Sequence, residues 1–160
     1  MLSLLLASLL AIPIASAAPT HALRPRFVEE TPWHLTDIAA FEAAPGPSGV
    51  SSISFHFCDT NTGIELETDC SRYLTPGSGA SAVDPDNYYS CDDPSVAFKF
   101  LGDSIAVERI YKDPSVGPPG MDVVTAFGNA NTSLESDTMA EGTTSYQQAL
   151  DVKITALIAK

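Results

Sequence analysis

The sequence predicts an all-β protein, a compact antiparallel β-barrel or sandwich of about seven to nine short strands with one disulfide. Three observations support this fold class. Apolar and polar residues alternate with a period of two in several short runs. Clusters of Gly, Pro, Asn and Asp separate these runs, as turns separate antiparallel strands. No run has the period of a long amphipathic helix, so strands must form the core.

The expected strands follow one another in order along the chain. They are an apolar segment over 33–41, alternating runs over 53–58 and 64–69, a Tyr-Tyr-Ser-Cys run over 88–91, alternating runs over 96–100 and 105–110, and a short strand over 123–127. Turn residues at 59–63 join two of these strands into a hairpin, and those at 102–103 join two others.

Three stretches lack a strand pattern. Residues 74–86 and 114–120 are loops, while 129–145 is a long polar stretch in which we expect one helical turn around 135–140. The last strand covers 150–158, and its regular alternation places five apolar residues on one face: Leu150, Val152, Ile154, Ala156 and Ile158. This strand would avoid an exposed edge by closing a barrel against an earlier strand.

Residues 1–17 are typical of a secretory signal peptide. The run from Leu2 to Ile14 is almost wholly apolar, and Ala15-Ser16-Ala17 supplies the small residues that cleavage needs. The run is shorter than the roughly 20 residues of a membrane-spanning helix. We therefore expect a secreted, extracellular protein with a flexible segment over 18–31 and a single barrel domain over 32–160.

The chain is strongly acidic. It has 20 Asp and Glu against 8 Lys and Arg, a formal charge of −12 at pH 7. Such a surface repels nucleic acid and anionic membranes, so we expect neither as a partner. The charge could attract a basic partner or a cationic ligand, or it could simply keep an exported domain soluble.

The chain has three cysteines, Cys58, Cys70 and Cys91. An oxidising compartment predicts one disulfide and one remaining thiol, and three pairings are open. We favour Cys70–Cys91, which closes a loop of about 20 residues and contributes about 3 kcal/mol in the chain-entropy model. Cys58 is then either a free thiol on a strand or a link between two chains.

The sequence does not present a catalytic motif. It lacks a Gly-rich phosphate loop, a Cys-x-x-Cys pair and a Gly-x-Ser-x-Gly elbow. His34 and His56 alternate with apolar neighbours and should face solvent, and we expect nothing to orient His56 as the base of a pair with Cys58. Asp84-Pro85-Asp86 and Asp92-Asp93 lack the glycine and terminal Glu of an EF-hand loop. We therefore expect neither an enzyme nor a cofactor or metal site.

Two further features are candidates for surface roles. Asn131-Thr132-Ser133 is an N-glycosylation sequon in a loop-like region, which an exported chain would carry to the glycosylation machinery. Trp33, Tyr88 and Tyr89 could form a recognition patch, but we favour core packing and a position beside the disulfide for them.

The order of several sequence features along the chain is similar to that of a known protein family. Its residues are Trp33-His34-Leu35, Ile53-Ser54-Phe55-His56-Phe57, Cys70, Tyr88-Tyr89-Ser90-Cys91 and Phe98-Lys99-Phe100. Over about residues 32–158 the chain resembles the fungal family of the Alternaria major allergen, a family of small secreted β-barrel proteins. The resemblance implies a compact antiparallel barrel with Cys70–Cys91 as the family's first internal disulfide. The second disulfide of the founding allergen and its chain-linking N-terminal cysteine have no counterpart here.

The same resemblance implies a function. It points to a secreted, non-catalytic protein that acts by binding a host extracellular protein, as an effector does. One alternative is an extracellular carrier that holds a small apolar or phenolic ligand in the mouth of the barrel. A second alternative is a secreted hydrolase whose site the sequence does not reveal.

Overall fold

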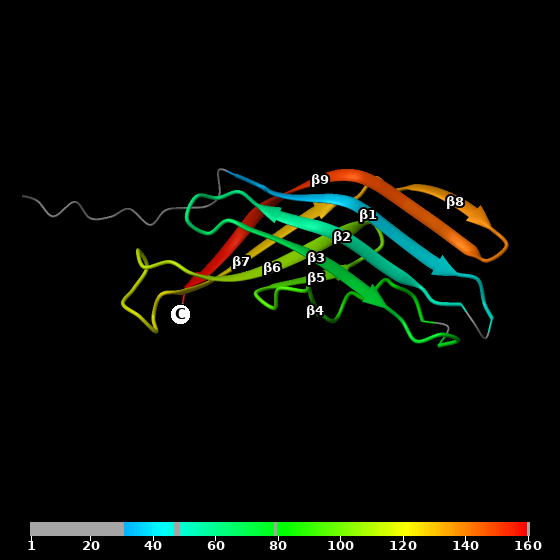
Figure 1. Ribbon diagram of the computed structural model, residues 1–160, viewed down its shortest axis with the longest axis horizontal. Helices are drawn as coiled ribbons and strands as arrows, with labels where there is room; N and C mark the ends of the chain where they lie inside the picture. Colours follow the sequence, from blue (N-terminus) through cyan, green and yellow to red (C-terminus); the bar gives the residue numbers. More distant parts are fainter. Residues whose placement is uncertain (1–30, 47–48, 79, 160) are drawn as a thin grey trace, which may run out of the picture.

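The computed structural model describes residues 31–46, 49–78 and 80–159, and Figure 1 shows their arrangement. The strands are β1 (Trp33–Ala43), β2 (Ser52–Asp59), β3 (Leu66–Tyr73), β4 (Tyr89–Ser90), β5 (Val96–Phe100), β6 (Ser104–Lys112), β7 (Val123–Asn131), β8 (Glu135–Met139) and β9 (Gly142–Ala159). The predicted signal peptide lies outside the described residues, as does the predicted flexible segment apart from Thr31. Within these ranges there is no helix of the length and hydropathy that crossing a bilayer requires.

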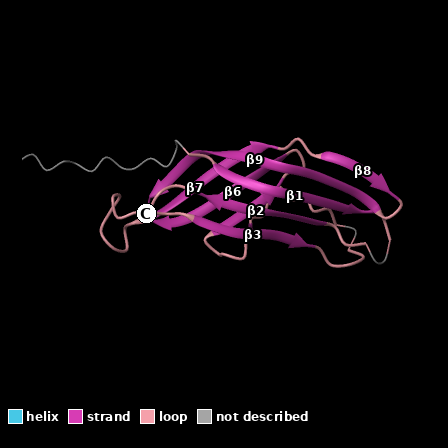
Figure 2. Cartoon of the chain, turned by 45° about the horizontal axis from the view of Figure 1, so that its top comes forward, coloured by secondary structure: helices cyan, strands magenta, loops and turns pink. Residues whose placement is uncertain are grey.

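All strand pairings are antiparallel, which confirms the predicted all-β class. The order across the sheet is β3-β2-β1-β9-β7-β6-β5-β4, and β8 pairs with the beginning of β9. Figure 2 shows the described residues as strands and loops. The predicted hairpins are β2–β3 and β5–β6, so both are confirmed. The chain's last strand, β9, lies inside the sheet between β1 and β7, rather than at an edge.

The sheet curls until its two edge strands, β3 and β4, meet in a nearly closed barrel. Cys70 on β3 is bonded to Cys91, which directly follows β4, and this is the predicted disulfide. The amide of Asp92 donates to the carbonyl of Asp69 at 2.9 Å, and the amide of Asp93 donates to Thr68 Oγ1 at 2.9 Å. We call this joint between the edge strands the seam.

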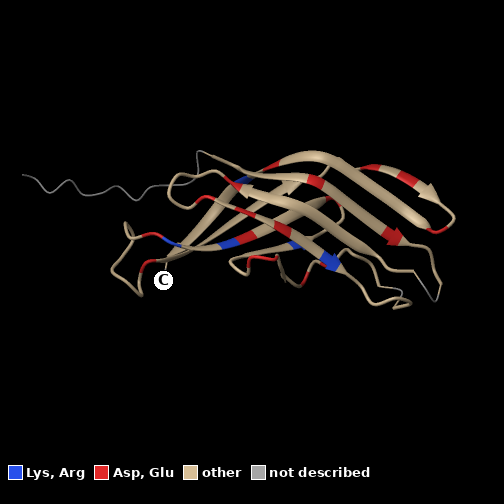
Figure 3. Ribbon diagram, in the orientation of Figure 1, with Lys and Arg blue, Asp and Glu red and all other residues tan. Residues whose placement is uncertain are grey.

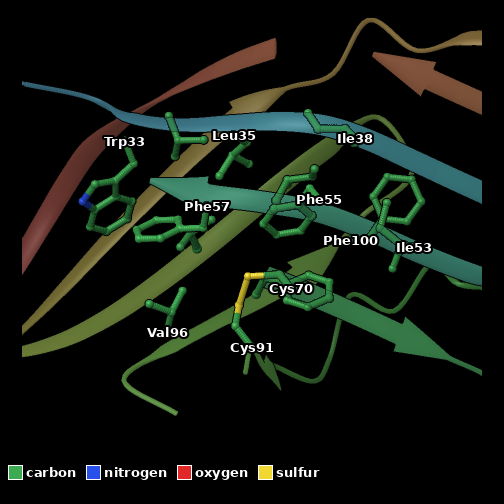
Figure 4. Close-up of a cluster of buried hydrophobic side chains, with 14 of the residues drawn as sticks. Trp33, Leu35, Ile38, Ile53, Phe55, Phe57, Cys70, Cys91, Val96 and Phe100 are labelled. Carbon is green, nitrogen blue, oxygen red and sulfur yellow. A yellow bond between two sulfur atoms is a disulfide. The ribbon is translucent and has the colours of Figure 1, made fainter. Parts of the chain in front are cut away.

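Alternating side chains from both sides of the barrel face one another in its interior and form one hydrophobic core, as Figure 4 shows. Phe55 on β2 packs edge-to-face on Phe98 of β5, with ring centroids 4.9 Å apart. Trp33 packs on Phe57 in the same manner at 5.6 Å. Many large apolar side chains of this core are fully buried: Trp33, Phe57, Phe98, Leu35, Ile38, Ile53, Ile105, Val96, Val107 and Val152.

Two bulges interrupt the alternation. Asp37 on β1 has a φ of 54°, and the extra residue there lets Leu35 and Ile38 both face the core although they are three positions apart. On β9, Gly128 pairs with Ile154 while Phe127 pairs with Ala156.

The predicted single apolar face of residues 150–158 is wrong beyond Ile154, because the bulge on β9 interrupts the alternation. Val152 and Ile154 face the core, but beyond the bulge the faces exchange, and Ile158 is exposed. A one-residue shift moves every later side chain to the opposite face, which is why a uniform alternation gave the wrong result here.

The predicted helical turn around 135–140 is wrong, because β8 and the start of β9 form a hairpin there. Ser136 lies 2.8 Å from Ser145 between hydroxyl oxygens, and Thr138 lies 3.1 Å from Thr143. The hairpin is held by backbone pairing and these cross-strand hydroxyl contacts. Because β8 has no buried face, its sequence does not alternate between apolar and polar residues, and the strand could not be recognised from that pattern.

We predict that removing the disulfide weakens the fold. The double variant Cys70→Ala/Cys91→Ala should lose about 3 kcal/mol of unfolding free energy, because the open chain gains conformational entropy when unfolded. Urea denaturation of the oxidised protein measures this loss. The control is Cys58→Ala, which leaves the disulfide intact and should change stability by about 1 kcal/mol or less. Equal stability of the double variant and the parent protein would contradict a structural role for the bridge.

Candidate functional site

A buried ion pair fills the interior where β1 begins and β2 ends. Asp59 is almost fully buried and accepts hydrogen bonds from Trp33 Nε1 at 2.9 Å and from the Asn61 amide at 2.8 Å. Arg109 donates to Asp59 through Nη1 and to the carbonyl of Ile64 through Nη2. Burial lowers the pKa of Arg109 to about 10, so the guanidinium remains charged at neutral pH. This pair is part of the packed core, and it fixes Trp33 there.

On the outer face of β1, β2 and β3, each of the two histidines that the structure describes has a carboxylate partner on a neighbouring strand. His34 Nδ1 lies 2.7 Å from Asp151, and His56 Nδ1 lies 2.8 Å from Asp69. Each contact joins residues that are directly opposite in the strand register. Both histidines face outward, as predicted, but the expectation that nothing orients His56 is wrong.

Cys58 lies on this same face and is a free cysteine in the chain. Its Sγ is 3.8 Å from Glu67 Oε1, and it sits opposite His34 in the register. Partial burial, the negative charge of Glu67 and the hydrogen bond to it raise the pKa of the thiol. Because the thiolate is the nucleophile, this environment disfavours nucleophilic chemistry at Cys58. A disulfide between two chains through Cys58 stays a prediction.

A second polar cluster, formed by Arg72, Asp84 and Tyr89, stabilises the loop that precedes β4. Asp84 accepts hydrogen bonds from the Tyr89 hydroxyl and from Arg72 Nη2, the latter at 3.3 Å. The guanidinium of Arg72 also stacks on the Tyr89 ring, 4.0 Å from its centroid. The Tyr89 hydroxyl, the Asp86 amide and Asn87 hold the pKa of Asp84 well below its usual range. Asp84 therefore acts as a charged anchor for the loop.

The acidic residues considered as calcium ligands do not converge on a common position. Asp93 accepts from the Ser95 amide at 2.8 Å, and Asp84 is occupied by Tyr89 and Arg72. Among the residues the structure describes, no three His, Cys, Asp or Glu side chains are arranged to hold a metal ion.

The remaining predicted residues lie apart from one another. Trp33 is in the core, Tyr89 is half-buried against it, and Tyr88 is 36% exposed on the outer surface. Asn131 is exposed as the last residue of β7, so its sequon begins on a strand rather than in the predicted loop. Glycosylation at Asn131 stays a prediction. The predicted site residues therefore do not form one site.

The described residues also line a hollow of about 480 Å³ near the β1–β2 connection, bordered by Phe41, Pro45, Val50, Ala140 and Glu141. It lies at the end of the β8–β9 hairpin, and none of its lining residues belongs to the hydrophobic core.

Comparison with solved structures identifies the fold. The crystal structure of the Alternaria alternata allergen Alt a 1 superposes with a TM-score of 0.53 and 13% sequence identity, covering 79% of this chain and 87% of the allergen chain. A second crystal structure of this major allergen gives a TM-score of 0.50 at 13% identity, over 80% and 93% of the two chains. No protein-family model and no curated protein sequence matches the chain. The likeness shows a shared β-barrel fold.

We predict that Asp84 makes the fold sensitive to acid. Its pKa is lowered on folding, so its contribution is fully present above the ordinary Asp pKa of about 4 and is lost as pH falls below that value. Asp84→Asn should be less stable than the parent protein at pH 7, and the difference should shrink toward about pH 2. Urea denaturation across this range measures it, with Asp86→Asn as the matched control. A difference that does not change with pH would contradict the assignment.

Proposed function

On the premise that this chain has the Alt a 1 fold, we propose that it is a secreted, non-catalytic fungal protein that binds a host extracellular protein, as an effector does. The sequence supports export through the signal-like residues 1–17, and a disulfide suits an oxidising compartment. The Alternaria resemblance of the sequence supports the effector-like role.

One observation carries the proposal of binding to a protein rather than to a small ligand. The barrel interior is filled by aromatic side chains and by the Asp59–Arg109 pair. A carrier that holds its ligand in the barrel mouth needs a concave site there that surrounds most of the ligand. The hollow beside Phe41 and Pro45 lies at the β1–β2 connection, and none of its lining residues belongs to the barrel core. The outer surface of the barrel is therefore the surface that we expect a partner to contact.

The outer-face chemistry supports a non-catalytic role. The free thiol of Cys58 has a raised pKa, so its thiolate form is disfavoured. A cysteine hydrolase needs the opposite thiol environment, one that favours the thiolate.

We predict that the protein retains a host protein from plant extracellular fluid. The bait is the Cys58→Ser variant, because its lack of a free thiol excludes capture through mixed disulfides. An unrelated acidic protein of similar isoelectric point serves as the control for charge alone. Retention of the same host protein by the bait and not by the control supports the proposal. Recovery of no host protein from bait that retains its fold would refute it.

We also predict that small phenolic ligands leave the fluorescence of Trp33 unchanged. Trp33 is the single tryptophan of the chain and is fully buried in the barrel, so it reports on ligand entry. Titration with a panel of flavonoids and simple phenols to about 100 μM should give no saturable change, since a carrier would bind below that concentration. Saturable quenching or a spectral shift would favour the carrier instead.

A further inference from the structure

The outer surface of β5, β6, β7 and the second half of β9 differs from the rest of the barrel. Its residues align in cross-strand rows, one of which runs Lys99, Ala106, Asn129, Lys153. We call this surface the lysine face and define it by Lys99, Glu108, Ile110, Lys112, Phe127, Lys153 and Ile158.

The centre of the lysine face is apolar. Ile110 and Ile158 flank Thr125 in one row and are 42% and 49% exposed. In the neighbouring row, the half-buried Phe127 lies between Glu108 and Ala156. Large apolar side chains on three adjacent strands therefore lie in two neighbouring rows rather than far apart from one another.

The packed interior is one reason that these side chains point outward. Inside β7 the facing positions are small, and a Cβ added at Gly128 would lie 2.7 Å from Val152 Cγ1 and 3.0 Å from Trp33 Cζ3. Phe127, beside Gly128, points to the outside. The bulge on β9 turns Ile158 outward as well.

The cations of the described residues are distributed unevenly, as the blue and red segments of Figure 3 show. Arg109 is buried against Asp59, and Arg72 is held by Asp84 and Tyr89. The three remaining cations among these residues, Lys99, Lys112 and Lys153, all belong to the lysine face.

The neighbouring outer surface carries the opposite charge. Glu67 and Asp69 lie on the outside of β3, and Asp151 lies on the outside of β9 beside β1. Glu135 and Asp137 are exposed on β8. Within a chain of net charge −12, the lysine face is therefore a local reversal of sign around an apolar centre.

We propose that the lysine face docks an acidic protein partner, whose surface has an apolar centre and carboxylates around it. The proposal rests on the proposed function and names its binding surface and partner chemistry. Burial of Ile110, Phe127 and Ile158 supplies the attraction, and the surrounding lysines select carboxylates. Two copies joined by this face would bring lysines together, and the acidic remainder of the chain opposes a lipid surface.

The test uses a named probe, the synthetic peptide Asp-Asp-Leu-Phe-Ile-Asp-Asp, and a control in which Lys replaces each Asp. We expect the acidic peptide, titrated to millimolar concentration, to shift backbone amide resonances of β5, β6, β7 and residues 153–159 in ¹⁵N NMR spectra. Shifts confined to other strands, no shifts, or equal shifts with the lysine peptide would overturn the proposal.

Two matched variants separate the face from net charge. Lys112→Glu/Lys153→Glu should weaken binding of the acidic peptide at least about fivefold and strengthen binding of the lysine peptide. Glu135→Lys/Asp137→Lys changes as many charges on β8 and should leave the mapped site unchanged. If the β8 variant alters affinity as much as the lysine variant, net charge governs binding and the proposal fails. Circular dichroism and Trp33 fluorescence establish that each variant is folded.

Two measurements test the other occupants of the face. Sedimentation equilibrium of the protein alone that showed a dimer, dissociated by Ile158→Asp, would assign the face to a second copy and overturn the proposal. Co-sedimentation with phosphatidylserine vesicles that Lys112→Glu/Lys153→Glu abolished would assign it to lipid and do the same.

The results of the peptide experiment and of the host-protein capture can be distinguished from each other. Capture of a host protein without peptide shifts on the lysine face would refute this surface while keeping the proposed function. Peptide shifts without capture would support the surface and refute the host-protein role.

Discussion

The barrel depends on the seam, where the two edge strands of the sheet are joined. Because β9 pairs with both β1 and β7, the open edges fall at β3 and β4, far from the chain's last strand. An unjoined pair of edges would expose backbone groups and let the sheet flatten. The Cys70–Cys91 bond and the Asp92–Asp69 hydrogen bond hold these edges together. With the seam joined, side chains from opposite walls, such as Phe55 and Phe98, can pack against each other.

Much of the fold can be read from the sequence because burial alternates locally along a strand. Ile53, Phe55 and Phe57 all face the core, and their spacing alone predicts this. The turn residues at 59–63 and 102–103 mark hairpins for an equally local reason, since Gly63 and Gly102 both have positive φ. The β8–β9 hairpin could not be predicted in this way, because it lacks an apolar face. The β9 bulge is set by its pairing with β7, which is not a property of β9 alone.

The candidate site residues also differ in how far the sequence alone could predict their contacts. The three cysteines predict one disulfide and leave three pairings open, and the family resemblance rather than loop length supports Cys70–Cys91. The partner of His34, by contrast, is Asp151, which lies 117 residues along the chain. Only the register of β1 on β9 brings them together. The lysine face likewise combines residues from four strands, and no continuous segment contains its pattern.

The space inside the barrel limits which side chains of β7 can face inward, and this affects the composition of the outer surface. Trp33 is anchored by Asp59, and with Val152 it leaves room only for glycine at position 128. The bulky neighbour Phe127 accordingly lies on the outside, where Ile110 and Ile158 add further apolar area. Because these side chains are only partly exposed, their exposure forgoes a part of the roughly 1.5–3 kcal/mol that full burial of each would provide. A partner that covers these side chains would recover that free energy, whereas the interior beside Gly128 has no room for a larger side chain. Tight packing within the barrel therefore favours recognition at its surface.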